Sequence, residues 1–147
     1  MIRRPTIKPE EAIAKVQAIY KELEARPIER NCELRTDCCH FKLTGQVPYL
    51  TAGEALVAAR AVRTSGLTRL PKVKDGNCPL LDPKTHRCSI YESRPFGCRT
   101  HFCAAAGGPY PRRQVIDLIH RLEDIGNALG GDEARQLPGA ITDMLFK

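Results

Sequence analysis

Seven cysteines are the residues of this 147-residue sequence with the greatest capacity for chemistry. They are Cys32, Cys38, Cys39, Cys78, Cys88, Cys98 and Cys103. Their odd number argues against a closed disulfide framework. No apolar segment follows Arg3 and Arg4, so we expect no secretory signal and a cytoplasmic protein whose thiols are reduced. Deprotonated thiols are strong ligands for zinc and for iron–sulfur clusters.

The cysteines fall into two groups, one at positions 32–39 and one at positions 78–103. The second group lies in a stretch of 45 residues, Gly66 to Tyr110, that is rich in proline, glycine and cysteine. A loop of this length is uncommon in a compact domain unless something organises it, and four converging thiolates could do so by binding a metal. A single cysteine is more often a small buried hydrophobic residue, but seven cysteines, six of them in turn-rich segments, favour a metal site.

The second group of cysteines also carries motifs that resemble those of a known family. The motifs are Cys78-Pro79-Leu80-Leu81, Cys88-Ser89-Ile90-Tyr91 and Arg94-Pro95-Phe96-Gly97-Cys98-Arg99. They are similar to motifs of the YkgJ-type cysteine-cluster (CxxCxxCC) family, whose members are described as zinc- or iron-chelating. The resemblance covers about residues 32–103. In addition, Leu50-Thr51-Ala52-Gly53-Glu54 sits where that family has a Leu-Thr-x-x-Glu step.

One position departs from the pattern of that family. The family's first cluster, C-x2-C-x2-C-C, would place cysteines at positions 32, 35, 38 and 39, but position 35 is Arg35. One implied ligand is therefore missing. The resemblance then implies a site whose ligands are shared between the two groups, or one that a histidine or a water completes.

The preferred ligands are the cysteines at which the resemblance is strongest, namely Cys39, Cys78, Cys88 and Cys98. Adjacent side chains point in different directions, so Cys38 and Cys39 are poorly placed to reach one metal together. The second choices, which could form a second site, line the first or be buried, are Cys38, Cys32 and Cys103. His40 and His101 flank cysteines and are candidate ligands, whereas we interpret His86 as a solvent-facing loop residue.

The metal stays open between an iron–sulfur cluster and Zn2+, with a slight preference for the cluster. Structural zinc sites usually place two cysteines on one tight turn. The four preferred cysteines are dispersed in the sequence instead, and dispersed cysteines can serve either centre. Arg35, Arg94 and Arg99 lie near cysteines in the sequence, where guanidinium groups could lower the pKa of thiols and donate hydrogen bonds to sulfur.

These features predict a cysteine-ligated metal-binding protein with a structural or a redox role. One alternative is an iron–sulfur oxidoreductase or electron carrier with a redox partner. Another is an accessory function in methyl transfer, because flagellin lysine methylases have a similar cysteine pattern. We find no glycine-rich cofactor loop and no Ser/His/Asp set, so catalysis without the metal is poorly supported. The net charge is +6, but the basic residues are scattered, so we do not expect nucleic-acid binding, and no apolar run is long enough for a membrane span.

The elements that must position the cysteines are predicted to be mainly helical. Apolar spacing predicts helices over Pro9–Ala25, from Thr51 to Ser65-Gly66, over about Arg112–Leu129 and over Pro138–Phe146. Thr51 and Glu54 form a predicted capping box, and Arg94-Pro95 is expected to fix the turn that aims Cys98. We therefore predict a mainly α single domain, 1–147, in which three to four helices surround a long irregular cysteine-rich metal-binding loop. Its cysteine region spans about 32–103 and its C-terminal helices about 112–147.

Overall fold

The structure is a computed structural model that describes residues 5–26, 47–71, 78–82, 84–85, 88–100, 110–131 and 134–146. Cys78, Cys88 and Cys98 lie within these ranges. The other candidate site residues lie outside the described residues, namely Cys32, Cys38, Cys39, Cys103, His40, His86, His101 and Arg35.

The described residues are mainly helical, as the sequence predicts. The longer helices are α1 (Pro9–Ala25), α3 (Ala52–Thr64), α5 (Ile116–Ala128) and α6 (Leu137–Leu145). They correspond to the four predicted helices, and α1 has the predicted bounds. The shorter elements are α4 (Phe96–Thr100), the 3-10 turns η2 (Tyr91–Ser93) and η4 (Arg112–Gln114), and the strands β1 (Tyr49–Leu50) and β2 (Arg135–Gln136).

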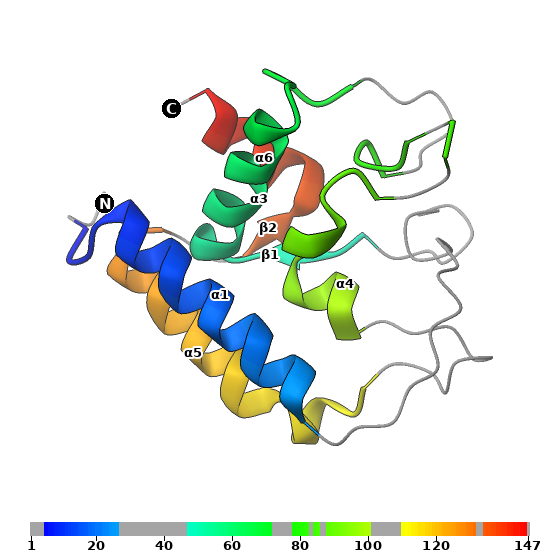
Figure 1. Cartoon of the computed structure of the whole chain (residues 1–147). Coiled ribbons are helices and arrows are strands. Elements are labelled where there is room, and N and C mark those ends of the chain that lie inside the picture. The colour runs from blue at the N-terminus through cyan, green and yellow to red at the C-terminus, as the bar shows by residue number, and fades with distance from the viewer. Residues whose placement is uncertain are drawn as a thin grey trace.

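Helices α1 and α5 lie side by side, and α3 packs against both (Figure 1). Their first apolar cluster contains the side chains that helical spacing places on one face, among them Ile13, Val16, Ile19, Tyr20 and Leu23 of α1 and Leu118, Leu122 and Ile125 of α5. Gly53, in the first turn of α3, permits this close packing. A Cβ there would lie 2.9 Å from Val16 Cγ2 and 3.0 Å from Ile125 Cγ2.

A second apolar cluster lies between α3 and α6. Its helical members are Ala55, Ala58 and Val62 of α3 and Leu137, Ala140 and Ile141 of α6. Strands β1 and β2 pair antiparallel, with Tyr49 opposite Gln136 and Leu50 opposite Arg135. The Leu137 N–H also donates a hydrogen bond of 2.8 Å to the carbonyl of Pro48. The beginning of α6 is therefore fixed beside the chain that leads into α3.

The third predicted helix begins later than the sequence indicates. Residues 112–114 form the 3-10 turn η4, and α5 begins at Ile116. The N–H groups of Gln114 and Val115 bond to carbonyls three residues earlier, at 3.0 Å each. The carbonyl of Gln114 accepts a hydrogen bond of 2.7 Å from Arg26 Nη1, so a contact between helices takes the place of an α-helical bond here.

The predicted irregular stretch, Gly66–Tyr110, contains more secondary structure than expected. Its described residues form η2, α4 and an isolated antiparallel bridge between Leu81 and Cys88. These elements are too short to leave a periodic apolar pattern in the sequence. The described part of the predicted irregular loop is therefore interrupted by short regular elements.

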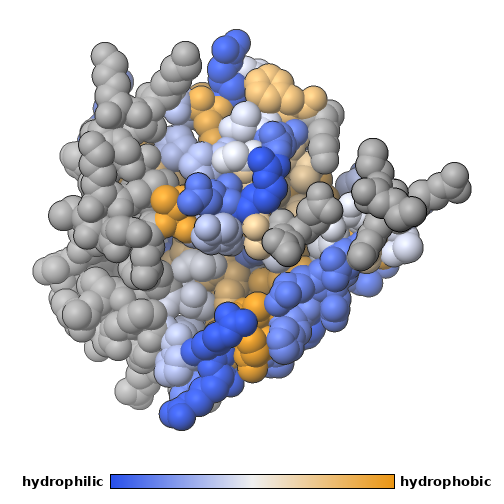
Figure 2. All heavy atoms as spheres, turned by 180° about the vertical axis from the view of Figure 1, so that it is seen from behind, coloured by the Kyte–Doolittle hydropathy of each residue, from blue (hydrophilic) through white to orange (hydrophobic). Residues whose placement is uncertain are grey.

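Hydrophilic residues predominate on the described part of the face opposite to that of Figure 1, and hydrophobic residues show between them (Figure 2). The large hydrophobic side chains that are exposed among the described residues are Tyr49, Leu67, Tyr91 and Phe146. Within the described ranges, no helix is both long enough and apolar enough to cross a membrane.

Candidate metal centre

Two reverse turns carry Cys78 and Cys88, and each turn begins at its cysteine. The carbonyl of Cys78 accepts the Leu81 N–H at 3.0 Å, and the carbonyl of Cys88 accepts the Tyr91 N–H at 3.3 Å. The bridge between Leu81 and Cys88, together with a 2.7 Å hydrogen bond from Ser89 N–H to the Leu80 carbonyl, joins the two turns. The first two motifs of the second cysteine group therefore form one folded unit.

Cys98 lies in α4, and this helix begins directly after the buried Pro95. The carbonyl of Pro95 accepts the N–H of Cys98 at 3.0 Å and the N–H of Arg99 at 3.1 Å. Proline fixes its own φ near the helical value and is favoured where a helix begins. Pro95 thus starts the helical turn that carries Cys98, which agrees with the predicted role of Arg94-Pro95.

The three described cysteines border the same apolar cluster between α3 and α6. Cys78 is 4% exposed and belongs to the cluster, together with Leu80 and Ile90. Cys88 and Cys98 are half-buried and pack against it. All three are thiols and not disulfides. The fold therefore brings three of the four preferred ligands to the same apolar cluster.

These three thiols do not form a finished coordination sphere. Within the described ranges, no three or more His, Cys, Asp or Glu side chains are arranged so that they could hold a metal ion. Cys39, the fourth preferred ligand, lies outside the described residues. A site that used all three described thiols would require them to move closer together. The chemistry of the donor set nevertheless fits a soft metal, because thiolates in apolar surroundings suit zinc and iron–sulfur centres.

A buried carboxylate, that of Glu54, connects the cysteine-bearing segment to the helices. Glu54 is 3% exposed and accepts four hydrogen bonds. Its Oε1 accepts from the Phe96 N–H at 2.7 Å and from the Tyr20 hydroxyl at 3.1 Å. Its Oε2 accepts from the N–H and the hydroxyl of Thr51 at 3.1 and 3.2 Å. The predicted capping box is confirmed, but the two bonds to Oε1 were not foreseen from the sequence.

Burial raises the pKa of the Glu54 carboxyl, while the hydrogen bonds from Phe96, Thr51 and Tyr20 act in the opposite direction. Burial also raises the pKa of the Tyr20 hydroxyl, and the neighbouring charge of Glu54 adds to this effect. A hydroxyl on the apolar face of a helix needs a polar partner when it is buried. That single tyrosine on the face of α1 was the signal in the sequence that could have indicated a buried acceptor.

Arg99, next to Cys98, is the second buried charged group among the described residues. It is 7% exposed, and burial lowers the pKa of its guanidinium. Its Nη1 donates to Glu24 Oε1 at 2.5 Å, and its Cζ lies 4.2 Å from the centroid of the Tyr20 ring. Its Nε and Nη2 donate to the carbonyls of Arg94 and Glu92 at 2.6 and 2.7 Å. Arg99 therefore ties α4 and η2 to α1.

Arg94 makes contacts of the same kind within the segment. Its Nε donates to the Tyr91 carbonyl at 3.0 Å, and its Cζ lies 3.9 Å from the centroid of the Tyr91 ring. The sequence suggested that Arg94 and Arg99 could act on sulfur, and this stays a prediction. The contacts given above direct both guanidinium groups at backbone carbonyls and aromatic rings, and that of Arg99 also at Glu24. They stabilise the turns that carry Cys88 and Cys98.

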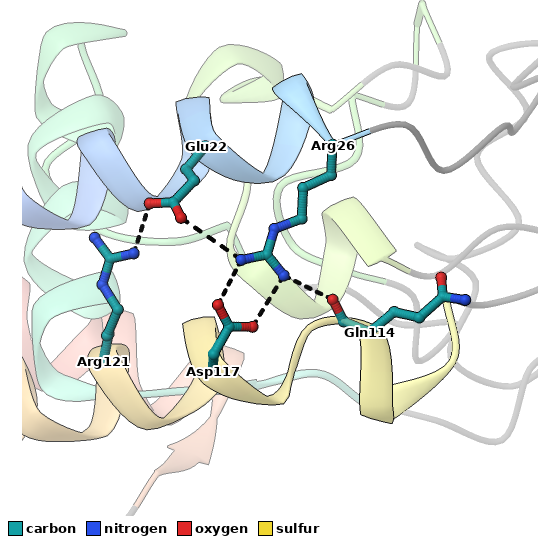
Figure 3. Close-up of polar contacts among 5 residues, drawn as sticks. All are labelled: Glu22, Arg26, Gln114, Asp117 and Arg121. Atoms are coloured by element: carbon teal, nitrogen blue, oxygen red, sulfur yellow. Dashed lines mark hydrogen bonds and ion pairs between the residues drawn. The ribbon is translucent and has the colours of Figure 1, made fainter.

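An exposed ion-pair network joins the C-terminal end of α1 to the start of α5 (Figure 3). Arg26 pairs with both oxygens of Asp117, at 2.9 and 2.5 Å, in addition to its bond with the Gln114 carbonyl. Glu22 pairs with Arg26 at 3.5 Å and with Arg121 at 2.5 Å. The Arg26 guanidinium lowers the pKa of Asp117 from 3.8 to about 2. The network therefore joins the end of α1, which precedes the first cysteine group in the sequence, to the start of α5, which follows the second cysteine group.

A comparison with protein families supports metal binding by this chain. The family model CxxCxxCC, described as "Putative zinc- or iron-chelating domain", matches residues 29–117. Comparisons with curated proteins and with solved structures gave no match. The matched range contains both cysteine groups, Glu54 and Arg99. The family description names zinc and iron, and the sequence left the choice open between zinc and an iron–sulfur cluster. Because the match covers more than half of the chain, this protein belongs to the CxxCxxCC family of zinc- or iron-chelating domains.

Proposed function

We propose that this protein binds its metal through the thiolates of Cys39, Cys78, Cys88 and Cys98. The observation that supports this choice most strongly is the shared position of three of these residues. Cys78, Cys88 and Cys98 come from three separate turns and border one apolar cluster. The second choices and the candidate histidines are the reserve ligands of the proposal, namely Cys32, Cys38, Cys103, His40 and His101.

Within this proposal the centre is an iron–sulfur cluster in preference to Zn2+. Structural zinc sites usually place two cysteines on one tight turn. Cys78 and Cys88 each begin a turn of their own, and Cys98 lies in α4. When bound, a cluster supplies one-electron redox chemistry whose potential depends on burial and on hydrogen bonds near sulfur. The chain's own contribution is to hold the thiolates and to exclude water through the apolar cluster between α3 and α6.

The proposed role of the metal centre is structural or redox, and the proposed location is the cytoplasm. A redox role would also require a redox partner. The described residues include two buried charged side chains, Glu54 and Arg99, and both serve contacts that fold the cysteine segment. Both side chains are engaged in hydrogen bonds within the fold. The proposal therefore assigns the chemistry to the metal centre and the positioning to these residues.

The test is to purify the protein without oxygen and to measure its absorption spectrum together with iron, zinc and acid-labile sulfide per chain. Iron and sulfide with a visible spectrum that reductant bleaches would support the cluster and a redox role. Zinc in a colourless protein would keep the thiolate site and refute the cluster. A folded protein with neither metal would overturn the proposal.

The ligand set is tested in the same assay with Cys39→Ala, Cys78→Ala, Cys88→Ala and Cys98→Ala. Each is expected to lower the metal content, whereas Cys32→Ala and Cys103→Ala should leave it near that of the unmodified protein. A reversed pattern would replace the preferred set with the reserve ligands.

A further inference from the structure

The Glu54 carboxylate does more than start its own helix. In a capping box the glutamate needs only one contact, with the N–H of the N-cap residue. Glu54 makes that contact with Oε2, toward Thr51. Its Oε1 faces away from the cap and accepts the N–H of Phe96, which lies 42 residues along the chain and two positions before Cys98. Helix α3 is therefore bonded directly to the first turn of α4.

The other side of Cys98 is tied to the same scaffold. Arg99 pairs with Glu24 of α1 and stacks on Tyr20, and the Tyr20 hydroxyl donates to Glu54 Oε1. The chain on each side of Cys98 is thus held by a buried charged group, and both of these groups contact Tyr20. One of them anchors the chain before the cysteine, and the other anchors the chain after it.

We infer that Glu54 is a positioning residue for Cys98. Through its bond to Phe96, Glu54 holds α4 against α1 and α3 before any metal is bound. This inference rests on the proposed function, since it takes Cys98 as a ligand. A ligand already held in place loses less conformational entropy on binding than a mobile one. Side chains that orient metal ligands from outside the coordination sphere typically contribute a factor of about 10 to 100 in metal affinity.

The hydrogen-bond pattern requires a carboxylate at this position. Each oxygen of Glu54 faces one backbone N–H and one hydroxyl, Phe96 and Tyr20 at Oε1 and Thr51 at Oε2. A hydroxyl can turn and accept, but a backbone N–H can only donate. In Glu54→Gln, either orientation of the amide therefore sets its NH2 group against a backbone N–H. The shape is kept while one of the two backbone hydrogen bonds is lost, either the bond from Phe96 or the bond from Thr51.

The experiment compares Glu54→Gln with a control that is destabilised in the same helical turn. Gly53→Ala crowds Val16 and Ile125 but keeps the Glu54 carboxylate, which is the acceptor of the Phe96 N–H. Both variants are purified without oxygen beside the unmodified protein. A chelator titration then gives the concentration that removes half of the bound metal, and the thiolate-to-metal absorption is recorded in parallel.

For Glu54→Gln we expect the half-removal concentration of chelator to fall by about 10- to 100-fold, with an altered absorption band. Gly53→Ala should retain the metal and the spectrum of the unmodified protein. In the metal-free proteins, alkylation followed by mass spectrometry should find Cys98 reacting faster in Glu54→Gln than in either of the others. Tyr20→Phe, which keeps the ring beneath Arg99 and removes one bond to Glu54, should show the same changes to a smaller degree.

Two outcomes separate the inference from the proposed function. If the unmodified protein binds no metal through thiols, the proposed function is overturned, and this inference with it. If the unmodified protein binds metal and Glu54→Gln retains it equally, with unchanged Cys98 alkylation, only the inference is overturned and Glu54 is a helix cap. If Glu54→Gln does not fold, Tyr20→Phe decides, and metal retention like that of the unmodified protein would again overturn the inference.

Discussion

Cys78 has a proposed role as a metal ligand and an observed role as a core residue. Substitutions at this position can separate the two. Its side chain is 4% exposed and packs in the second apolar cluster. Cys78→Ala removes the sulfur from this packing, which should lower the unfolding free energy of the metal-free chain by about 1 kcal/mol, as the loss of a buried methylene does. Cys78→Ser keeps the size but places a hydroxyl among apolar side chains, and an unpaired hydroxyl there costs about 1–3 kcal/mol. Serine should therefore destabilise the metal-free chain at least as much as alanine.

If Cys78 is a ligand, neither substitution restores its thiolate, so both variants should lose metal to a similar extent although their stabilities differ. The assay is metal content per chain after anaerobic purification, with urea unfolding of the metal-free proteins measured beside it. Ile90→Val is the matched control, because it trims the same cluster at a cost of about 0.5–1.5 kcal/mol and keeps every cysteine. A Cys78→Ala protein with the metal content of the Ile90→Val control would refute the ligand role and leave Cys78 as a buried hydrophobic residue.

The remaining predictions concern the scaffold. Gly53→Ala should lower the unfolding free energy by up to about 2 kcal/mol, since overpacking costs about 1–3 kcal/mol and the helix gains about 1 kcal/mol from alanine. Gly139→Ala in α6, where an added Cβ meets only an Arg side chain at 3.5 Å, should be neutral or stabilising in the same urea assay, and an equal loss in both would contradict the close-approach argument. The lowered pKa of Asp117 means that its pairing with Arg26 stabilises the fold fully above pH 3.8 and is lost as the pH falls to about 2. The stability difference between the unmodified protein and Asp117→Asn should therefore shrink over that range, and a difference independent of pH would argue against the ion pair.

The helices were predictable because each long one carries a strong local signal. In α1 the apolar residues recur at helical spacing between a proline at the start and Arg26-Pro27 at the end, and the structure keeps those bounds. The two-residue strands carry no such signal. Tyr49 and Gln136 pair only because the chain brings α3 and α6 together, which is a long-range property. The same holds for α4, whose five residues form a helix in a segment rich in glycine and proline.

At the candidate site, local spacing indicated half of what Glu54 does. The capping box with Thr51 follows from positions three residues apart, and the structure confirms it. The bond from Phe96 to Glu54 depends on how α3, α4 and α1 pack, and spacing along the chain does not encode it. Arg99 illustrates the same limit. Its position beside Cys98 suggested an action on sulfur, whereas its described contacts are with Glu24, Tyr20 and two backbone carbonyls.

The arginine at position 35 bears on the scaffold of the second cysteine group. The family's first cluster would have a cysteine at that position, and under the proposed function the second group supplies ligands in its place. Among its described residues, Cys78, Leu80 and Ile90 are buried in the second cluster and Phe96 in the first. Burying the charges of Glu54 and Arg99 gives less stability than apolar residues of similar size would give. Their presence is better explained by geometry, since their directed hydrogen bonds place α4 and Cys98 where apolar packing alone would leave several arrangements open.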